Sequence, residues 1–224
     1  MVMVKHLIIT LDGPAGAGKS SVAKALAKRL GVSYLDTGAM YRALTLKALR
    51  SKIKLDDEQS LTELAKKTTI DFKEMPDGSL NVTLDGQDVA EDIRSVEVTN
   101  NTFYTAQAPE VRKLMVQWQR EIAQRRSVVT DGRDQGTVAF PQADYKFYVD
   151  ARFEERVRRR LVELKNAGKI VDPEQLKKDM QDRDQKDFTR AVGPLKKAED
   201  AIVIESTDFS VDQTVEAILK YIQK

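Results

Sequence analysis

The sequence contains no cysteine and only one histidine, His6, among its 224 residues. The missing cysteines exclude disulfides and thiolate chemistry, which fits the reducing cytosol, so we expect a cytoplasmic protein. A single histidine rules out a His-based metal site and a Ser-His-Asp triad. The formal net charge is only +2, so no global field draws the chain toward nucleic acid.

Long hydrophobic runs are also missing. The apolar run at 7–11 is too short to span a membrane and has no charged leader before it, so we expect neither a membrane span nor a signal peptide. Hydrophobic residues nevertheless make up 41% of the chain. A chain of this length and composition can bury a sizeable core, as one large domain or as one domain with an insertion.

The beginning of the chain predicts the start of a parallel α/β sheet. The apolar run is followed by a glycine-rich loop, by an amphipathic helix that Gly31 ends, and by a short strand at 32–35. The later part of the chain continues the same alternation. Further strands are predicted at 127–130, 145–149 and 201–204, and helices at 153–166, at 211–222, and from Pro109 and Pro173 onward.

The middle of the chain has a different pattern. Helix is predicted over roughly 40–66, and between Ile70 and Val89 apolar and polar residues then alternate. Two turn signals, at 76–78 (Pro-Asp-Gly) and at 85–86 (Asp-Gly), divide this stretch. The pattern predicts a small antiparallel sheet inside an inserted subdomain.

Residues 13–20 match a phosphate-binding motif, G-x-x-x-x-G-K-[ST], in full and in the expected strand-to-helix context. The glycines let backbone N–H groups meet phosphate oxygens, Lys19 is placed for the β- and γ-phosphates, and Ser20 for Mg²⁺. The candidate nucleotide-binding residues are Gly13, Pro14, Ala15, Gly16, Ala17, Gly18, Lys19, Ser20 and Ser21. The motif predicts a nucleoside triphosphate and magnesium but no acceptor, because motors, switches and kinases share it.

Asp131, Arg133 and Asp134 directly follow the predicted strand at 127–130. Ligands of open α/β sheets bind at the carboxyl ends of the strands. Asp131 can orient Mg²⁺ or its waters, and the planar guanidinium of Arg133 can clamp a phosphate. The alternative interpretation is a charged surface turn without a ligand.

One predicted helix carries a row of arginines on a single face. Their spacing is i, i+4, i+7 and i+8, and they are Arg152, Arg156, Arg159 and Arg160. Such a face suits a polyanion such as ATP beside a second phosphate. The alternative is a solvated basic face.

A later helix, if it continues far enough, presents Arg183, Asp187 and Arg190 at i, i+4 and i+7. This face can hydrogen-bond sugar hydroxyls and a phosphate together, or it can be an ordinary salt-bridged surface. Thr37 and Arg42, which follow the strand at 32–35, also suit a phosphate, although this signal is weak by itself.

Taken together, these segments resemble the bacterial cytidylate kinases, of the nucleoside monophosphate kinase superfamily, over nearly the whole chain. The resemblance lies in 13–20, in 36–42 (Asp-Thr-Gly-Ala-Met-Tyr-Arg), in 131–137 (Asp-Gly-Arg-Asp-Gln-Gly-Thr), in Arg183-Asp184 and in 190–195 (Arg-Ala-Val-Gly-Pro-Leu). It implies an α/β fold with a three-layer, parallel-sheet P-loop kinase core at 1–38 and 110–224. It also implies an inserted monophosphate-binding subdomain at 39–109 and a short lid at about 151–170.

The resemblance implies a role for each candidate residue. On the acceptor side, Thr37, Arg42 and Arg133 would contact the CMP phosphate, Arg112 and Asp134 would recognise cytosine, Arg183 and Asp187 would hold the ribose, and Arg190 would bridge phosphates. The implied catalytic residues are Lys19, Asp131, Arg156, Arg159 and Arg160, with Arg156 and Arg159 or Arg160 lying in the lid over the transferred phosphoryl group. The family commonly has a serine near the base where this chain has Phe103, with Thr102 and Thr105 close in sequence.

The implied function is phosphorylation of CMP and dCMP by in-line transfer from ATP with Mg²⁺. A monophosphate is already an oxyanion near neutral pH, because its second pKa is about 6, so no general base is needed. We expect a monomer that acts on these small molecules, not on nucleic acid or at a membrane. Two alternatives stay open: a kinase for another acceptor such as AMP, UMP or shikimate, and a nucleotide-dependent switch or binding protein, against which the many arginines argue.

Overall fold

The structure is a computed structural model that describes residues 6–74 and 80–222. Contacts divide the chain into two compact units. The first unit contains Gly31–Val128, and the second contains Leu7–Leu30 and the described residues from Val129 onward. The division at 39 and 109 that the resemblance implies stays a prediction.

The second unit is built on a sheet with the strand order β6-β1-β7-β8. Its strands are β1 (Ile8–Asp12), β6 (Val128–Gly132), β7 (Tyr145–Asp150) and β8 (Ile202–Glu205). β7 pairs in parallel with both β1 and β8, so that Phe147 lies opposite Leu11 on one side and opposite Ile202 on the other. Phe147 and Leu11 are almost fully buried, as expected for a sheet covered on both faces. The predicted α/β fold with a parallel sheet is confirmed.

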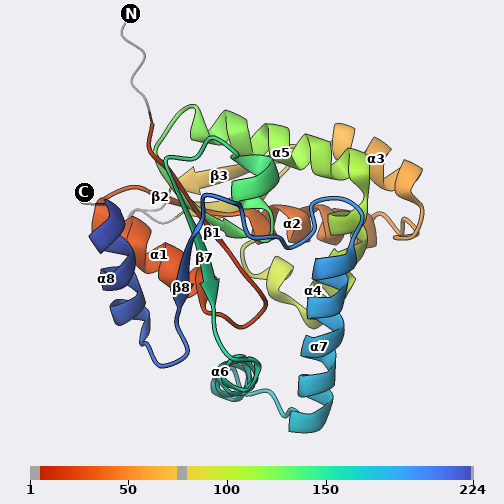
Figure 1. The fold of residues 1–224 in the computed structure, drawn as a ribbon. Coiled ribbons are helices and arrows are strands. Elements are labelled where there is room, and N and C mark those ends of the chain that lie inside the picture. Colours follow the sequence, from red (N-terminus) through yellow and green to blue (C-terminus); the bar gives the residue numbers. More distant parts are fainter. Residues whose placement is uncertain (1–5, 75–79, 223–224) are drawn as a thin grey trace, which may run out of the picture. The chain divides into compact units, whose positions relative to one another are not determined.

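Helices flank this sheet. They are α1 (Lys19–Leu30), α6 (Phe153–Asn166), α7 (Pro173–Thr189) and α8 (Val211–Ile222), together with a π-helical turn, η2 (Gln135–Ala139). α1 and α8 pack side by side, and α6 packs against α7 (Figure 1). The start of α7 is the predicted one, because Asp172 caps it by accepting a hydrogen bond from the N–H of Glu174 and Pro173 is its first residue.

The first unit holds β2 (Ser33–Asp36), α2 (Thr37–Arg50), α3 (Glu58–Lys66), the short 3₁₀ turn η1 (Asp92–Arg94), α4 (Val96–Gln107) and α5 (Pro109–Ala123). The stretch predicted as helical over roughly 40–66 contains two separate helices, α2 and α3. Lys52 adopts a φ of 54°, a left-handed conformation that ends a helix. Asp57 then accepts a hydrogen bond from the N–H of Ser60 and starts α3 as its N-cap.

The first unit contains the small antiparallel sheet that the sequence predicts, while its role as an inserted subdomain stays a prediction. Its strands, in the order β3-β4-β5, are β3 (Ile70–Glu74), β4 (Leu80–Leu84) and β5 (Gln87–Asp88). Asp85 and Gly86 both have positive φ, 50° and 83°, as a tight hairpin turn between β4 and β5 requires. The other predicted turn, at 76–78, lies outside the described residues.

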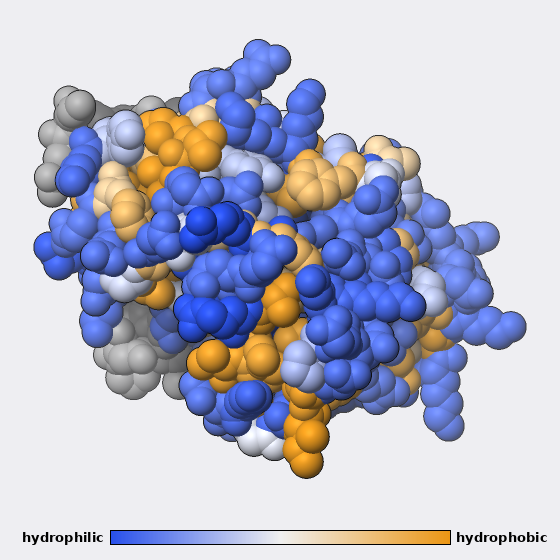
Figure 2. All heavy atoms as spheres, turned by 60° about the horizontal axis from the view of Figure 1, so that its bottom comes forward, coloured by the Kyte–Doolittle hydropathy of each residue, from blue (hydrophilic) through white to orange (hydrophobic). Residues whose placement is uncertain are grey.

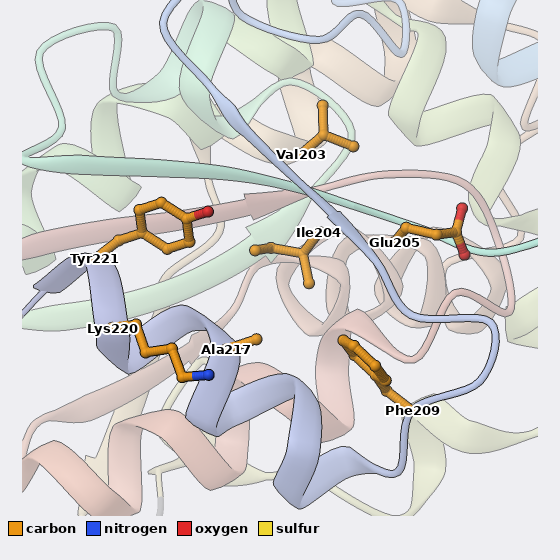
Figure 3. Close-up of a pocket in the computed structure, with 7 residues that line it drawn as sticks. All are labelled: Val203, Ile204, Glu205, Phe209, Ala217, Lys220 and Tyr221. Carbon is orange, nitrogen blue, oxygen red and sulfur yellow. The ribbon is translucent and has the colours of Figure 1, made fainter.

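No helix within 6–74 and 80–222 is both long enough and apolar enough to cross a membrane. The face drawn in Figure 2 is mostly hydrophilic, with hydrophobic side chains interspersed. Val203, Phe209 and Tyr221 are among the large hydrophobic side chains that stay exposed, and they help to line a hollow of about 400 Å³ beside β8 and α8 (Figure 3). None of the predicted site residues lines this hollow, so it is not the candidate site.

Candidate active site

The glycine-rich loop joins β1 to α1 within the second unit. A Cβ atom at Gly13 would lie 2.0 Å from the carbonyl oxygen of Val149, and one at Gly16 would lie 2.9 Å from that of Arg156. Both glycines also have positive φ, so no other residue fits either position without strain. The loop leads directly into α1, whose first N–H groups and dipole favour an anion.

Lys19 is buried at the start of α1, and only 5% of its surface is exposed. Its ammonium donates a hydrogen bond of 2.6 Å to the carbonyl oxygen of Pro14. Burial and the nearby Arg133 lower the pKa of Lys19 to about 7, while Asp131 opposes this shift. A bound polyphosphate would supply the negative charge that favours the ammonium form.

Ser20 and Asp131 form a pair of oxygen donors next to Lys19. The Ser20 hydroxyl donates to the Asp131 carboxylate over 2.7 Å. These hard oxygen ligands fit Mg²⁺, which binds proteins through few side chains and takes its other ligands from phosphates and water. Among the described residues no group of three or more His, Cys, Asp or Glu side chains could hold a metal. The hard oxygens of Ser20 and Asp131 fit a magnesium ion that arrives with a nucleotide.

A second charged cluster lies between the end of β6 and the end of α7. Arg133 donates to Asp187 over 2.6 Å, and Arg190 lies 3.6 Å from Asp134 and 4.0 Å from Asp187. Burial alone would raise the pKa of Asp187, but Arg133 holds it below its usual value. Arg183 is exposed on α7 and, like Arg133, helps to lower the pKa of Lys19. The structure thus brings the predicted Arg133, Asp134, Asp187 and Arg190 together.

The arginine row of α6 is less free than its spacing suggests. Arg156 is buried and donates to Asp184 over 2.6 Å and to the carbonyl oxygen of Ala15 over 2.9 Å. Asp184 also accepts a hydrogen bond from the N–H of Ala15. Arg156 and Asp184 therefore brace the phosphate loop from α6 and α7.

Arg159 and Arg160 have different surroundings. Arg159 contacts Glu155 and donates to the carbonyl oxygens of Ser206 and Thr207, so it holds the segment that follows β8. Arg160 pairs with Glu163 over 2.7 Å at the surface. The arginine row is therefore largely compensated by acidic and carbonyl partners, and its role at the transferred phosphoryl group stays a prediction.

The first unit carries the remaining predicted residues. Thr37 is buried at the start of α2, where Asp36 caps the helix and also accepts a hydrogen bond from Arg42 over 3.1 Å. The Nε atom of Arg42 is buried and has no hydrogen-bond partner in the part of the chain that the structure describes. Arg112 donates to the carbonyl oxygen of Ala106 over 2.9 Å and lies 5.5 Å from the ring centre of Tyr41.

Comparison with known families identifies the chain. A family model described as cytidylate kinase matches residues 9–224. The chain belongs to the cytidylate kinase family. Relatives named cytidylate kinase include one from Desulforamulus reducens, 50% identical over 222 residues and covering 99% of both chains. Another, from Caldanaerobacter subterraneus, is 48% identical and covers 96% of this chain and 94% of its own.

Solved structures support the fold of this cytidylate kinase family member. An uncharacterized protein from Eubacterium ventriosum superposes with a TM-score of 0.55 at 16% identity, covering 98% of this chain and 99% of its own. At this identity the similarity concerns the fold alone. The family match makes the chain a kinase, as the resemblance of its motifs predicted.

Phe103 lies on α4, where its ring packs edge-to-face against Tyr104 at 6.0 Å. Its two threonine neighbours have local hydrogen-bond partners. Thr102 donates to the carbonyl oxygen of Val98, and Thr105 is buried with its hydroxyl 2.9 Å from that of Thr45. The Thr102 hydroxyl is used as a donor but, like any hydroxyl, can still accept a hydrogen bond, and Phe103 stays the predicted departure from the cytidylate kinase pattern.

Sequence reasoning missed three residues that support this site. Asp12 accepts hydrogen bonds from the turn after β6, Asp184 braces the loop, and Ser206 donates to the carbonyl oxygen of Asp150 at the end of β7. Asp12 had a usable signal, because a carboxylate that ends an apolar strand needs a polar partner. Asp184 belongs to the Arg183-Asp184 motif of the resemblance but was given no role, and Ser206 had no distinctive local pattern.

Proposed function

We propose that this kinase transfers the terminal phosphoryl group of ATP to CMP and dCMP, giving CDP or dCDP and ADP. The observation that carries the proposal is the presence of two anion-binding sets in one unit. The first set is the phosphate loop with Lys19, and the second contains Arg133. The two sets are close enough for Arg133 to lower the pKa of Lys19. Two neighbouring anion sites suit a donor and an acceptor that both carry phosphate.

The proposed reaction is an in-line displacement. A phosphate oxygen of CMP attacks the γ-phosphorus of ATP, the bond from that phosphorus to the β,γ-bridging oxygen breaks, and ADP leaves with the electron pair. The attacking oxygen carries no proton above about pH 6, so no residue has to act as a base. Lys19, Arg133 and the arginines of α6 are then required for alignment and charge neutralisation.

Ser20 and Asp131 would hold Mg²⁺, whose chemistry at this site is to neutralise charge on the donor phosphates. The proximity of the two oxygens, 2.7 Å, supports this assignment. We also propose that the protein works as a monomer in the cytoplasm, where ATP and monophosphates are available. Sedimentation of the purified protein tests its oligomeric state.

In the proposed reaction, Asp134 makes the enzyme select cytosine over uracil. It is 4% exposed, and its carboxylate faces Arg190 at 3.6 Å. A carboxylate accepts a hydrogen bond from the amino group of cytosine, whereas the carbonyl group of uracil at that position offers no proton. Buried polar mismatches of this kind discriminate strongly between substrates.

An ADP-release assay over CMP, dCMP, UMP, AMP and shikimate, with a control lacking any acceptor, tests the function. We expect CMP and dCMP to be the best acceptors and UMP to be clearly poorer. Equal turnover of AMP and CMP would contradict the proposal. Slow hydrolysis that no acceptor accelerates would identify a nucleotide-dependent switch instead.

A further inference from the structure

Asp12, the last residue of β1, makes contacts that the proposed reaction does not use. Its carboxylate accepts a hydrogen bond of 2.9 Å from the N–H of Gln135 and one of 2.7 Å from the N–H of Gly136. The side chain is 4% exposed. Two consecutive N–H groups thus converge on one carboxylate, an arrangement that binds anions well.

The turn that Asp12 holds is the one that carries Arg133 and Asp134. It runs from the end of β6 into the π-helical turn η2, which begins at Gln135. A Cβ atom at Gly136 would lie 3.1 Å from the Thr10 hydroxyl and 3.4 Å from the Asp12 carboxylate, so the turn sits tightly on β1. π-Helical turns often occur at functional sites, and this one is fastened to the strand that leads into the phosphate loop.

The charged groups around Asp12 come from three elements. Burial raises the pKa of Asp12 to about 6, against the two backbone N–H groups, and Asp134 raises it further while Lys19 of α1 lowers it. On β7, Asp12 contributes to the raised pKa of Tyr148. The ammonium of Lys146, on the same strand, is bonded instead to Asp200 and to the carbonyl oxygen of Pro141.

We propose that Asp12 is a positioning residue for the acceptor. Its carboxylate accepts hydrogen bonds from the N–H groups of Gln135 and Gly136 and thereby holds Arg133 and Asp134 in place beside the phosphate loop. This inference rests on the proposed function. The anionic carboxylate matters because both its contacts are donors, and a neutral amide in its place would turn an N–H₂ group toward one of them. Asp12 touches neither substrate in this account and acts through the turn.

Steady-state kinetics of Asp12→Asn in the full chain tests the proposal. We expect the KM for CMP to rise about tenfold while the KM for ATP changes less than about twofold, because the disturbed residues belong to the acceptor side. Asp144→Asn is the matched control. Its carboxylate accepts one backbone N–H at the opposite end of β1, from Ile8 at 2.9 Å, and we expect both KM values to stay unchanged.

The pH dependence separates positioning from a merely structural contact. Both proteins meet the same substrate at each pH, so titration of CMP cancels in the ratio of their kcat/KM values. We expect the advantage of the wild type over Asp12→Asn to be largest above pH 7 and to shrink below pH 6, where Asp12 gains a proton. A ratio that stays constant between pH 5 and pH 8 would overturn the proposal.

A second variant covers the case in which Asp12→Asn is too unstable for kinetics. Gly136→Ala adds a Cβ that presses the same turn away from β1. A selective rise in the KM for CMP supports the proposal, and an equal rise in both KM values contradicts it. If the wild type itself fails to phosphorylate CMP, the proposed function fails. If the wild type is active and neither variant affects CMP selectively, only the positioning role of Asp12 fails.

Discussion

At the scale of single residues, the fold stabilises the charged forms of some site residues and destabilises the charged form of another. Arg133 and Asp187 are partners, and although burial opposes both charges, each pKa shifts toward the charged form. Burial lowers the pKa of Lys19, and the opposing effects of Asp131 and Asp187 do not cancel this shift. The protein thus keeps one cationic group destabilised until an anion arrives, which is a frequent property of functional sites.

Replacing Lys19 should therefore separate stability from activity. In Lys19→Met we expect phosphoryl transfer to fall more than about a hundredfold, because the charge beside the β- and γ-phosphates is lost. We expect the free energy of unfolding of the ligand-free protein at pH 7 to rise by about 0.5–2 kcal/mol, because a destabilised functional group is removed. Urea unfolding and the coupled assay measure the two effects.

The sign of the pH effect follows from the lowered pKa. Between about pH 7 and pH 10.5 the unfolded state binds more protons at Lys19 than the folded state does, so this residue makes the wild type more stable as the pH rises. The stabilisation by Lys19→Met should therefore be smaller at pH 9.5 than at pH 7. Lys24→Met, at an exposed position of the same helix, should change neither stability nor activity. More than a tenth of wild-type kcat in Lys19→Met would contradict its role.

Phe103 stands where the resemblance implies that the family commonly has a serine. An aromatic contact with a base is worth about 1–3 kcal/mol, and a hydrogen bond about 0.5–1.5 kcal/mol net, so a ring can replace a hydroxyl in affinity while loosening base selectivity. We expect Phe103→Ser to change the CMP-to-UMP ratio of kcat/KM by at least about threefold, or about 0.65 kcal/mol. The ratio is to be measured at unchanged Tm. An unchanged ratio would make Phe103 a packing residue.

Among the secondary-structure elements, α6 and α7 are joined to the phosphate loop through one buried ion pair. Arg156 and Asp184 are each 8% exposed, and both bond to the backbone of Ala15. Removing one partner of such a pair leaves an uncompensated buried charge. The geometry of the loop therefore depends on two helices that are distant from it in the sequence.

We expect Arg156→Met to lower the free energy of unfolding by about 3–5 kcal/mol. Arg158→Met is the matched control on the same helix: Arg158 pairs with Glu155 at the surface, and we expect a change below about 1 kcal/mol. Urea unfolding measures both variants. The double variant with Asp184→Asn should recover part of the loss, and losses that simply add would show that the pair is not coupled.

Over the whole molecule, stability should report on ligand binding by mass action. At about a hundredfold excess over its Kd, CMP should add about 2.7 kcal/mol, which corresponds to a rise in Tm of about 5–10 °C for a chain of this size. Cytidine, which lacks the phosphate, should have a much smaller effect, because the candidate arginines bind the phosphate. Thermal unfolding with CMP, UMP and cytidine measures the difference. Equal shifts for CMP and cytidine would contradict a phosphate-directed site.

Local sequence patterns determined several helices, caps and turns of this protein and its phosphate loop. The helix predicted at 153–166 has those bounds in the structure, and the cap at Asp172 and the turn at 85–86 lie where their residue types require them. The phosphate loop was equally predictable, because its backbone conformation depends on glycines within the motif itself. Such features arise from interactions within a few residues, which is why the sequence alone contains the information.

Only the tertiary structure decided which charged side chains contact one another and which backbone groups they bind. Asp12 and Gln135 are 123 residues apart, and Arg156 and Asp184 are 28 apart, yet each pair forms a hydrogen bond. The spacing of arginines on α6 predicted their shared face but not that Asp184 would neutralise Arg156 or that Arg159 would hold the segment after β8. Burial and ion pairing depend on which elements pack together, and no local periodicity records that. The sequence by itself determined the motif, the class of fold and the helices, and tertiary packing decided how the charged groups of the site are held.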